Sequence, residues 1–87
     1  ENDVEGVFNV FAYPNPYREG FYVEIDSDFD TPVTIAIYDL NGKLVEVYQD
    51  VDPLGLPEMG LNLSSGMYVV AVNQAGHTKV IKVNKLN

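Results

Sequence analysis

Apolar and polar side chains alternate along short stretches of this chain, and turn-forming residues separate the stretches. The clearest example runs from Gly20 to Asp26, where Phe21, Val23 and Ile25 share one face. Successive side chains of a strand point to opposite faces, so this alternation predicts a half-buried strand. No helical period is sustained anywhere in the chain.

The same pattern predicts six further strands, over residues 7–13, 33–40, 43–51, 58–63, 67–72 and 80–83. In the 58–63 strand, Leu61 and Leu63 share a face. Seven short strands with turn signals at roughly ten-residue spacing are typical of an immunoglobulin-like antiparallel β-sandwich, so we expect an all-β fold. The side chains expected to face its core are Phe8, Val10, Phe21, Val23, Ile25, Val33, Ile35, Ile37, Val45, Val47, Tyr68, Val70, Val72, Ile81 and Val83.

Two proline-containing segments interrupt the strands. Pro14 and Pro16 remove two backbone donors, and Asn15 between them is restricted to extended geometry, so 13–16 is predicted to be a rigid corner. Residues 52–57 also contain two prolines and are predicted to form a loop between sheets, held in place by Leu54 and Leu56.

Two reversals between strands carry hairpin signals. Asn41-Gly42 predicts a type I′ turn, which needs a positive φ at both central residues. A second hairpin is expected over 63–83, with its reversal at 74–76. The apolar runs on either side of that reversal make this hairpin the largest packing element of the predicted sandwich.

The bulk composition indicates one small acidic domain. The chain has 87 residues, no cysteine, a net charge of −8 and a pI near 4.2. This charge argues against nucleic acid as a partner, and no apolar stretch is long enough for membrane insertion. The first residue is Glu1 and residues 1–6 are polar, so we expect a fragment or processed product with a linker at 1–6 and one domain at 7–87.

The charge is distributed unevenly along the chain. Residues 1–58 carry a net charge of −11, whereas residues 59–87 carry +3 and contain no acidic residue. Lysine on an edge strand is a common protection against aggregation. The alternative is that a partner binds the basic terminus, through Lys79, Lys82 and Lys85.

No motif predicts catalysis. His77 is the one histidine of the chain, and it lies beside the predicted last turn. A nucleophile–base pair with Ser64 or Ser65 would lack a third group to orient the base, so an exposed turn histidine is the better interpretation. We expect no enzyme activity and no cofactor.

Two weak binding patterns occur among the acidic and aromatic residues. Asp26, Asp28 and Asp30 open like a calcium loop, but Thr31 stands where glycine is needed, and a solvated acidic turn is the simpler interpretation. Aromatic platforms bind sugars, but tyrosine is also common in strands, and Tyr38 and Tyr48 are placed to pair across one hairpin. The platform would consist of Tyr13, Tyr17, Tyr22, Tyr38, Tyr48 and Tyr68.

Four motifs occur in a characteristic order: Tyr-Pro-Asn-Pro at 13–16, Asp-Leu-Asn-Gly-Lys at 39–43, Leu-Ser-Ser-Gly-Met-Tyr-Val-Val at 63–70, and Lys-Val-Ile-Lys-Val at 79–83. The set resembles the C-terminal sorting domain of the type IX (Por) secretion system of Bacteroidota. Two departures occur. Tyr17 stands in place of the usual Phe after the proline corner, which is a mild change, and the tail runs on through Asn84-Lys85-Leu86-Asn87, which leaves open which lysine plays the terminal role.

The resemblance implies a secretion signal and not an enzyme. Members are fused after a cargo protein, pass through the periplasm, bind the outer-membrane translocon and are usually removed by a surface sortase, so the cargo reaches the cell surface or the extracellular space. We also expect the exposed last strand to allow weak self-association. The matching motif residues are Tyr13, Pro14, Asn15, Pro16, Gly42, Lys43, Gly66, Tyr68, Lys79, Val80, Ile81, Lys82, Val83 and Lys85.

A structural or adhesive immunoglobulin-like module is the alternative that the sequence leaves open. A flagellar hook-cap-like domain shares the proline corner and a Gly-x-Tyr strand, and a carbohydrate-binding accessory module is the other member of this class. The domain order of a parent protein would separate these alternatives from a sorting signal.

Overall fold

The computed structural model describes residues 7–87, so the linker expected at 1–6 lies outside the described residues. The predicted all-β fold is confirmed. The strands are β1 Phe8–Tyr13, β2 Tyr22–Ser27, β3 Val33–Asp39, β4 Leu44–Val51, β5 Gly66–Gln74 and β6 His77–Lys85. Among these residues there are six strands, where the sequence predicted seven.

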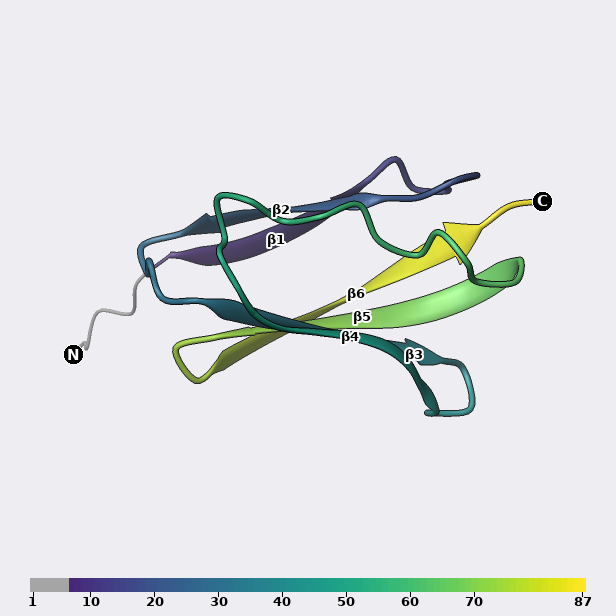
Figure 1. Cartoon of the computed structure of the whole chain (residues 1–87). Helices are drawn as coiled ribbons and strands as arrows, with labels where there is room; N and C mark the ends of the chain where they lie inside the picture. The colour runs from purple at the N-terminus through teal and green to yellow at the C-terminus, as the bar shows by residue number, and fades with distance from the viewer. Residues whose placement is uncertain (1–6) are drawn as a thin grey trace.

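Two antiparallel sheets face each other. β1 and β2 form the first sheet, and the second has the order β4-β3-β5-β6. In Figure 1 the two-stranded sheet lies above the four-stranded one, and β6 rises toward it at the end that carries the C-terminus. In this strand order, β6 lies at one edge of the larger sheet and β4 lies at the other.

Residues 7–87 contain no helix with the length and apolar character needed to span a membrane.

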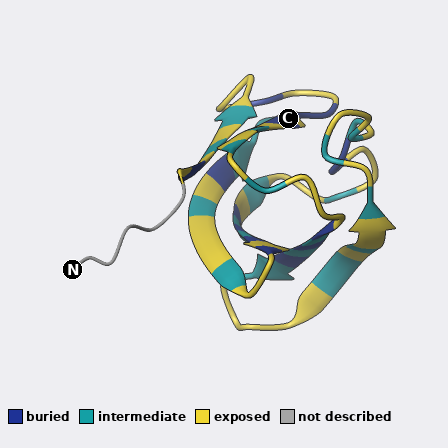
Figure 2. Cartoon of the chain, turned by 90° about the vertical axis from the view of Figure 1, so that its left-hand side faces the viewer, coloured by how far each residue is buried: buried dark blue, intermediate teal, exposed yellow. Residues whose placement is uncertain are grey.

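The core lies between the two sheets. Val33, Ile35 and Ile37 of β3 are fully buried, as are Val70 and Val72 of β5. Burying such a side chain stabilises a fold by about 1.5–3 kcal/mol, so β3 and β5 form the centre of the domain. Figure 2 shows this buried interior ringed by exposed strand faces. The other side chains predicted to face the core are buried or pack against it, except for one residue of β4.

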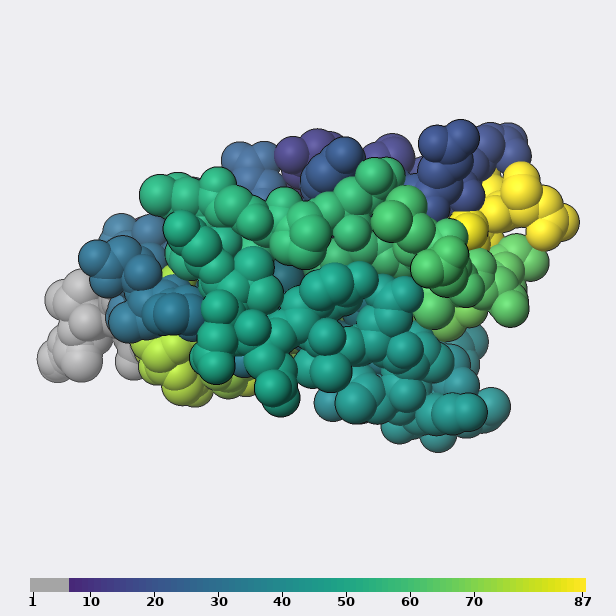
Figure 3. Space-filling model, in the orientation of Figure 1, coloured from purple at the N-terminus to yellow at the C-terminus, as the bar shows by residue number. Residues whose placement is uncertain are grey.

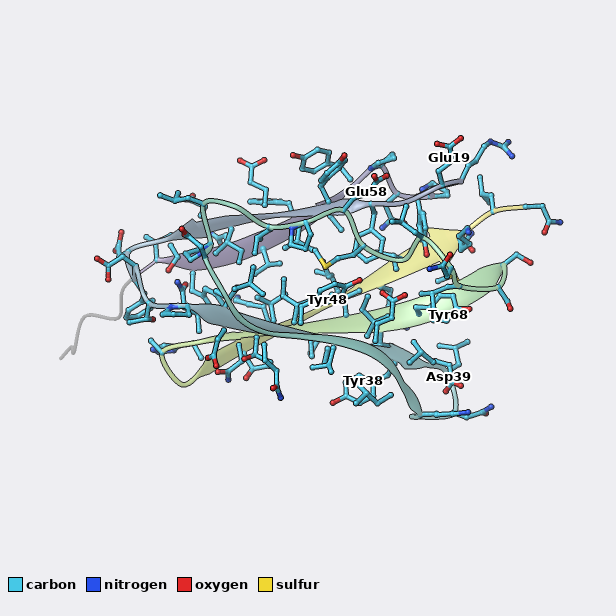
Figure 4. All side chains as sticks on the ribbon, viewed as in Figure 1. Glu19, Tyr38, Asp39, Tyr48, Glu58 and Tyr68 are labelled. Carbon is cyan, nitrogen blue, oxygen red and sulfur yellow. The ribbon has the colours of Figure 1, made fainter. Side chains whose placement is uncertain are left out.

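Val47 is that exception, because its side chain is 45% exposed. The ladder pairs Ile35 with Tyr48 and Ile37 with Glu46, so Tyr48 and Glu46 point inward. The pairing register between β3 and β4 changes on both sides of this stretch of β3. A register change of one residue turns the side chains of a strand to the opposite face, which is why Val47 points outward. The predicted Tyr38–Tyr48 pair is also wrong: Figure 4 places Tyr48 between the layers and Tyr38 on the outer side of its sheet.

The segment between β4 and β5 does not contain the strand predicted at 58–63. Met59 forms one isolated bridge with Phe21, through backbone hydrogen bonds of 2.8 and 2.9 Å, and is fully buried. Leu56 packs against the core as predicted, but Leu54 is 96% exposed and does not hold the loop in place. Leu61 is also exposed, so Leu61 and Leu63 do not form a common buried face.

The two hairpin turns differ from the expected assignment. At 39–43 only Gly42 has a positive φ, of 84°, so Asn41-Gly42 is not a type I′ turn. The Asp39 carboxylate instead accepts hydrogen bonds from the backbone N–H groups of Asn41 and Lys43, at 2.9 and 3.0 Å. The turn with two positive φ values is Ala75-Gly76, at 53° and 81°, and it joins β5 directly to β6.

Candidate functional site

The motif residues gather toward one end of the sandwich. The ladders place Tyr13 beside Tyr22, Asp39 beside Tyr68, and Gly66 beside Lys85. Figure 1 shows that this end carries the C-terminus, whereas the described chain enters at the opposite end. The proline corner, the Asp39 turn, the Gly-x-Tyr element and the end of β6 therefore share one end, and only the start of β6 extends away from it.

The proline corner lies along the end of β6. The Asn15 side-chain amide donates a 2.8 Å hydrogen bond to the carbonyl oxygen of Lys82, and its Oδ1 accepts a 3.1 Å bond from the Asn84 N–H. The Tyr17 N–H then donates to the Asn84 carbonyl at 2.9 Å, and the Leu86 N–H donates to the Tyr17 carbonyl at 2.7 Å. Figure 3 shows the terminal residues in yellow against the blue residues of the corner. The corner therefore acts as a short neighbouring strand.

Tyr17 fastens this contact to the core. Its side chain is 1% exposed, and its hydroxyl donates a 3.0 Å hydrogen bond to the Gly60 carbonyl. Burial raises the pKa of Tyr17 to about 12, with smaller contributions from Tyr68 and Glu46. The ammonium of Lys85 lies 5.5 Å from the centre of the Tyr17 ring and donates to the Leu63 carbonyl at 3.2 Å. Lys85 is therefore half-buried and engaged, unlike the exposed Lys79 and Lys82.

The other half of the β6 edge has no hydrogen-bonded neighbour, although β1 of the other sheet packs close to β6. Antiparallel ladders alternate, so the residues that share a side with Lys82 and Asn84 direct their backbone groups away from β5. These residues are Thr78 and Val80, both exposed, and Val80 is 59% exposed. Within residues 7–87, no strand pairs with β6 on this side, and its one bridge there joins Lys85 to Tyr17. The open edge thus extends from Thr78 to the N–H of Lys82.

The other motif residues have structural positions. Gly66 has a φ of 144°, which disfavours any other residue there although the space around it is empty. Tyr68 is buried, and its hydroxyl donates a 2.6 Å hydrogen bond to the Ser64 carbonyl. Gly42 and Lys43 lie on the turn from β3 to β4, which β3 and β5 separate from β6.

His77 is not the exposed turn residue that the sequence predicted. It begins β6, is half-buried, and its ring stacks on Phe29 with centroids 4.9 Å apart and planes at 23°. Ser64 and Ser65 precede Gly66, which pairs with Lys85 at the far end of the hairpin. Nine-residue strands separate the two ends by roughly 30 Å, so His77 cannot act as a base for either serine.

The acidic run does not form a metal centre in the described part of the chain. Residues 7–87 contain no group of three or more histidine or carboxylate side chains that could hold an ion. Asp28 has a structural contact instead, since its Oδ2 accepts a 2.9 Å hydrogen bond from the Val7 N–H.

The six tyrosines do not share a platform. Tyr17 and Tyr68 are buried, and Tyr38 and Tyr48 lie on opposite faces of their sheet. Tyr13 and Tyr22 remain exposed side by side on the two-stranded sheet, with ring centroids 5.9 Å apart.

Sequence patterns missed several residues that hold the site in place. Gly60 approaches Tyr17 so closely that an added Cβ would lie 2.5 Å from the Tyr17 hydroxyl. Gln74 is fully buried, and its amide nitrogen donates to the carbonyls of Phe29 and Thr31 at 3.2 and 2.8 Å. Only Gln74 carried a signal, because it continues the alternation of Val70 and Val72.

Comparison with known proteins identifies the family. The model of the secretion system C-terminal sorting domain matches residues 11–85, which is most of the chain. The chain belongs to this family. Searches of curated proteins and of solved structures found no match. The matched range begins in β1 and ends at the last residue of β6, so it includes both the proline corner and the strand that the corner covers.

This sorting domain is a C-terminal sorting signal of the type IX secretion system, as the sequence predicted. Its role implies contact with the secretion machinery and a fused cargo, and export to the cell surface or the extracellular space. The family is not a catalytic one. The structural or adhesive module that the sequence left open is not favoured.

Proposed function

We propose that the secretion machinery binds this sorting domain along the open edge of β6, from Thr78 to Lys82. A row of N–H and C=O groups without a neighbouring strand is a template for strand addition, in which an extended partner segment forms main-chain hydrogen bonds. The observation that carries the proposal is the sharp limit of this edge: Asn15 covers it from the Lys82 carbonyl onward, whereas Thr78, Lys79 and Val80 before that point are exposed.

Lys79 and Lys82 supply the electrostatic part of the contact. Both side chains are exposed on the open half of β6, and no acidic residue follows Glu58 in the sequence. Positive groups on an otherwise acidic domain direct a partner with an acidic surface to this edge, and they affect the association rate more than the final affinity. Lys85 belongs to the packing of the corner.

The motif residues divide into two groups under this proposal. One group has structural positions in the sandwich: Tyr13, Pro14, Asn15, Pro16, Gly42, Lys43, Gly66, Tyr68, Ile81, Val83 and Lys85. The other group contacts the machinery: Lys79, Val80 and Lys82, with the backbone of Thr78.

The partner in this model is a component of the outer-membrane translocon of a Bacteroidota cell. The cargo is fused before residue 7, at the end of the sandwich opposite the proline corner. The domain passes through the periplasm with its cargo, and a surface sortase then removes it within or before the acidic residues 1–6. Family membership supports this sequence of steps.

Val80→Pro and Val80→Ala test the strand-addition step. The Val80 N–H points away from β5, and proline is tolerated at an edge position whose N–H faces solvent. Proline therefore removes one N–H from the open edge, whereas alanine keeps it and removes only the side chain. Each variant is expressed as a fusion to a reporter cargo in a cell with a type IX system, and surface reporter is measured by protease accessibility.

We expect Val80→Pro to lower surface reporter by about tenfold, the effect of losing roughly 1.4 kcal/mol of binding. Val80→Ala should export normally. Thermal unfolding of both variant domains is the control for folding. Normal export of a folded Val80→Pro variant would contradict strand addition at this edge.

A further inference from the structure

The side chain of Asn15 imitates the backbone of a neighbouring strand. It donates to the Lys82 carbonyl and accepts from the Asn84 N–H, at 2.8 and 3.1 Å. These two groups flank Val83 on the outer side of β6, where a residue of a parallel strand would make the same pair of bonds. A side-chain amide carries both a donor and an acceptor, so asparagine can fill this position and alanine cannot.

This contact determines what can pair with the open edge. An antiparallel pair of two copies, centred on their Val80 residues, would place Thr78 of one copy opposite Lys82 of the other and Gly76 opposite Asn84. The Asn15 amide and the Tyr17 backbone already occupy the space beside Asn84. The Asn15 amide also holds the Lys82 carbonyl, which Thr78 of a second copy would need in order to pair with Lys82.

We infer that Asn15 is an edge cap that prevents β6 from pairing with a second copy of this chain. The cap leaves room for an extended segment that ends opposite Lys82, and it excludes a β-hairpin edge that continues past this point. Edge strands are a general liability for self-pairing, and natural sheets cover them with loops or charged residues. The inference deepens the proposed function and rests on it only for the identity of the strand that adds to β6. The effect of the cap on self-association does not depend on the proposed function, because it is measured without the secretion machinery.

Asn15→Ala tests the cap in the purified 87-residue chain. The substitution frees the Lys82 carbonyl and the Asn84 N–H, so Thr78 of a second copy can pair with Lys82, while the Tyr17 backbone keeps the Asn84 carbonyl. We expect the wild-type chain to sediment as a monomer over the whole concentration range of an analytical ultracentrifugation series. The Asn15→Ala chain should approach twice that mass at the highest concentrations, and its Asn84 amide should exchange with solvent about tenfold faster.

Two further variants keep the test decisive. Asn15→Ala combined with Val80→Pro should return to the monomer mass, because the proline removes an N–H from the edge that the copies would share. Asn15→Asp retains the acceptor for the Asn84 N–H but sets a second acceptor against the Lys82 carbonyl oxygen, so it should release the cap in the same way as alanine. If Asn15→Ala does not fold, Asn15→Ser, which is too short to reach both groups, replaces it.

A monomeric Asn15→Ala chain with an exposed Asn84 amide would overturn the inference, as would a wild-type dimer or a dimer that Val80→Pro leaves intact. These outcomes are independent of the export assay. Loss of export in Val80→Pro together with a monomeric Asn15→Ala chain would reject the cap and keep the proposed function. Normal export of Val80→Pro together with a dimeric Asn15→Ala chain would reject the proposed function and keep the cap.

Discussion

Replacing Tyr17 with phenylalanine removes one hydroxyl from the contact that joins the proline corner to the core. That hydroxyl donates a 3.0 Å hydrogen bond to the Gly60 carbonyl, and the side chain around it is 1% exposed. Phenylalanine fills nearly the same space but leaves the buried carbonyl unpaired, which costs about 1–3 kcal/mol. For a domain of this size, each kcal/mol lowers the melting temperature by about 4–8 °C.

The same hydroxyl makes stability depend on alkaline pH. Burial raises the pKa of Tyr17 from 10.0 to about 12, so the folded state holds the phenolic proton more tightly than the unfolded state. The contribution is therefore fully present below pH 10 and is lost as the pH rises through about 12. A shift of this size corresponds to about 2.7 kcal/mol in total, of which about 1.4 kcal/mol is lost by pH 11.

Urea unfolding followed by circular dichroism at pH 8 and pH 11 measures both effects. Because other groups titrate in this range, the useful quantity is the difference in unfolding free energy between wild type and Tyr17→Phe. We predict that this difference shrinks by about 1.4 kcal/mol between the two pH values. Tyr13→Phe is the matched control, since Tyr13 is half exposed, and its stability should stay within about 0.5 kcal/mol of wild type. A difference that does not change with pH would refute the reasoning.

Three further predictions follow from the geometry. Gly60→Ala should destabilise the domain by about 2–4 kcal/mol in urea unfolding, because its φ of 72° disfavours alanine and the added carbon would overlap the Tyr17 hydroxyl; wild-type stability would disprove this close contact. Ala75→Asn should raise the unfolding free energy by about 0.5–1 kcal/mol, because the φ of 53° suits asparagine better; no gain in thermal stability would count against the observed turn. Exchanging Lys79 and Lys82 for glutamate should reduce surface delivery of a cargo more than Lys43→Glu does; equal effects would rule out a local electrostatic contact.

The strands of this fold follow from local alternation, but their faces depend on pairing. Val33, Ile35 and Ile37 have the simple period of two, and all three are buried as predicted. The same reasoning placed Val47 inward, although it is exposed. The register shifts in the β3–β4 ladder decide the face of Val47, and nothing in the local sequence of β4 encodes them.

The candidate site was also predicted only in part: its motifs are visible in the sequence, but the contacts between them are not. The sequence identified the proline corner and the end of β6 as separate motifs, and it predicted the last strand as an exposed edge. The hydrogen bonds that join Asn15 to Lys82 and Asn84 cross nearly the whole length of the chain. A pattern within one segment cannot reveal such a contact, so the limit of the open edge emerged only from the fold.

Position-specific crosslinking tests most directly the claim that the machinery contacts the open edge of β6. A photoreactive residue is placed at Val80 or at Val47, two exposed valines on opposite edge strands of the same sheet. Both are activated in cells that are exporting the fused cargo, and the products are analysed for translocon components. The account predicts a covalent product with a translocon component from position 80 and none from position 47. A product from position 47 alone, or equal products from both, would contradict it.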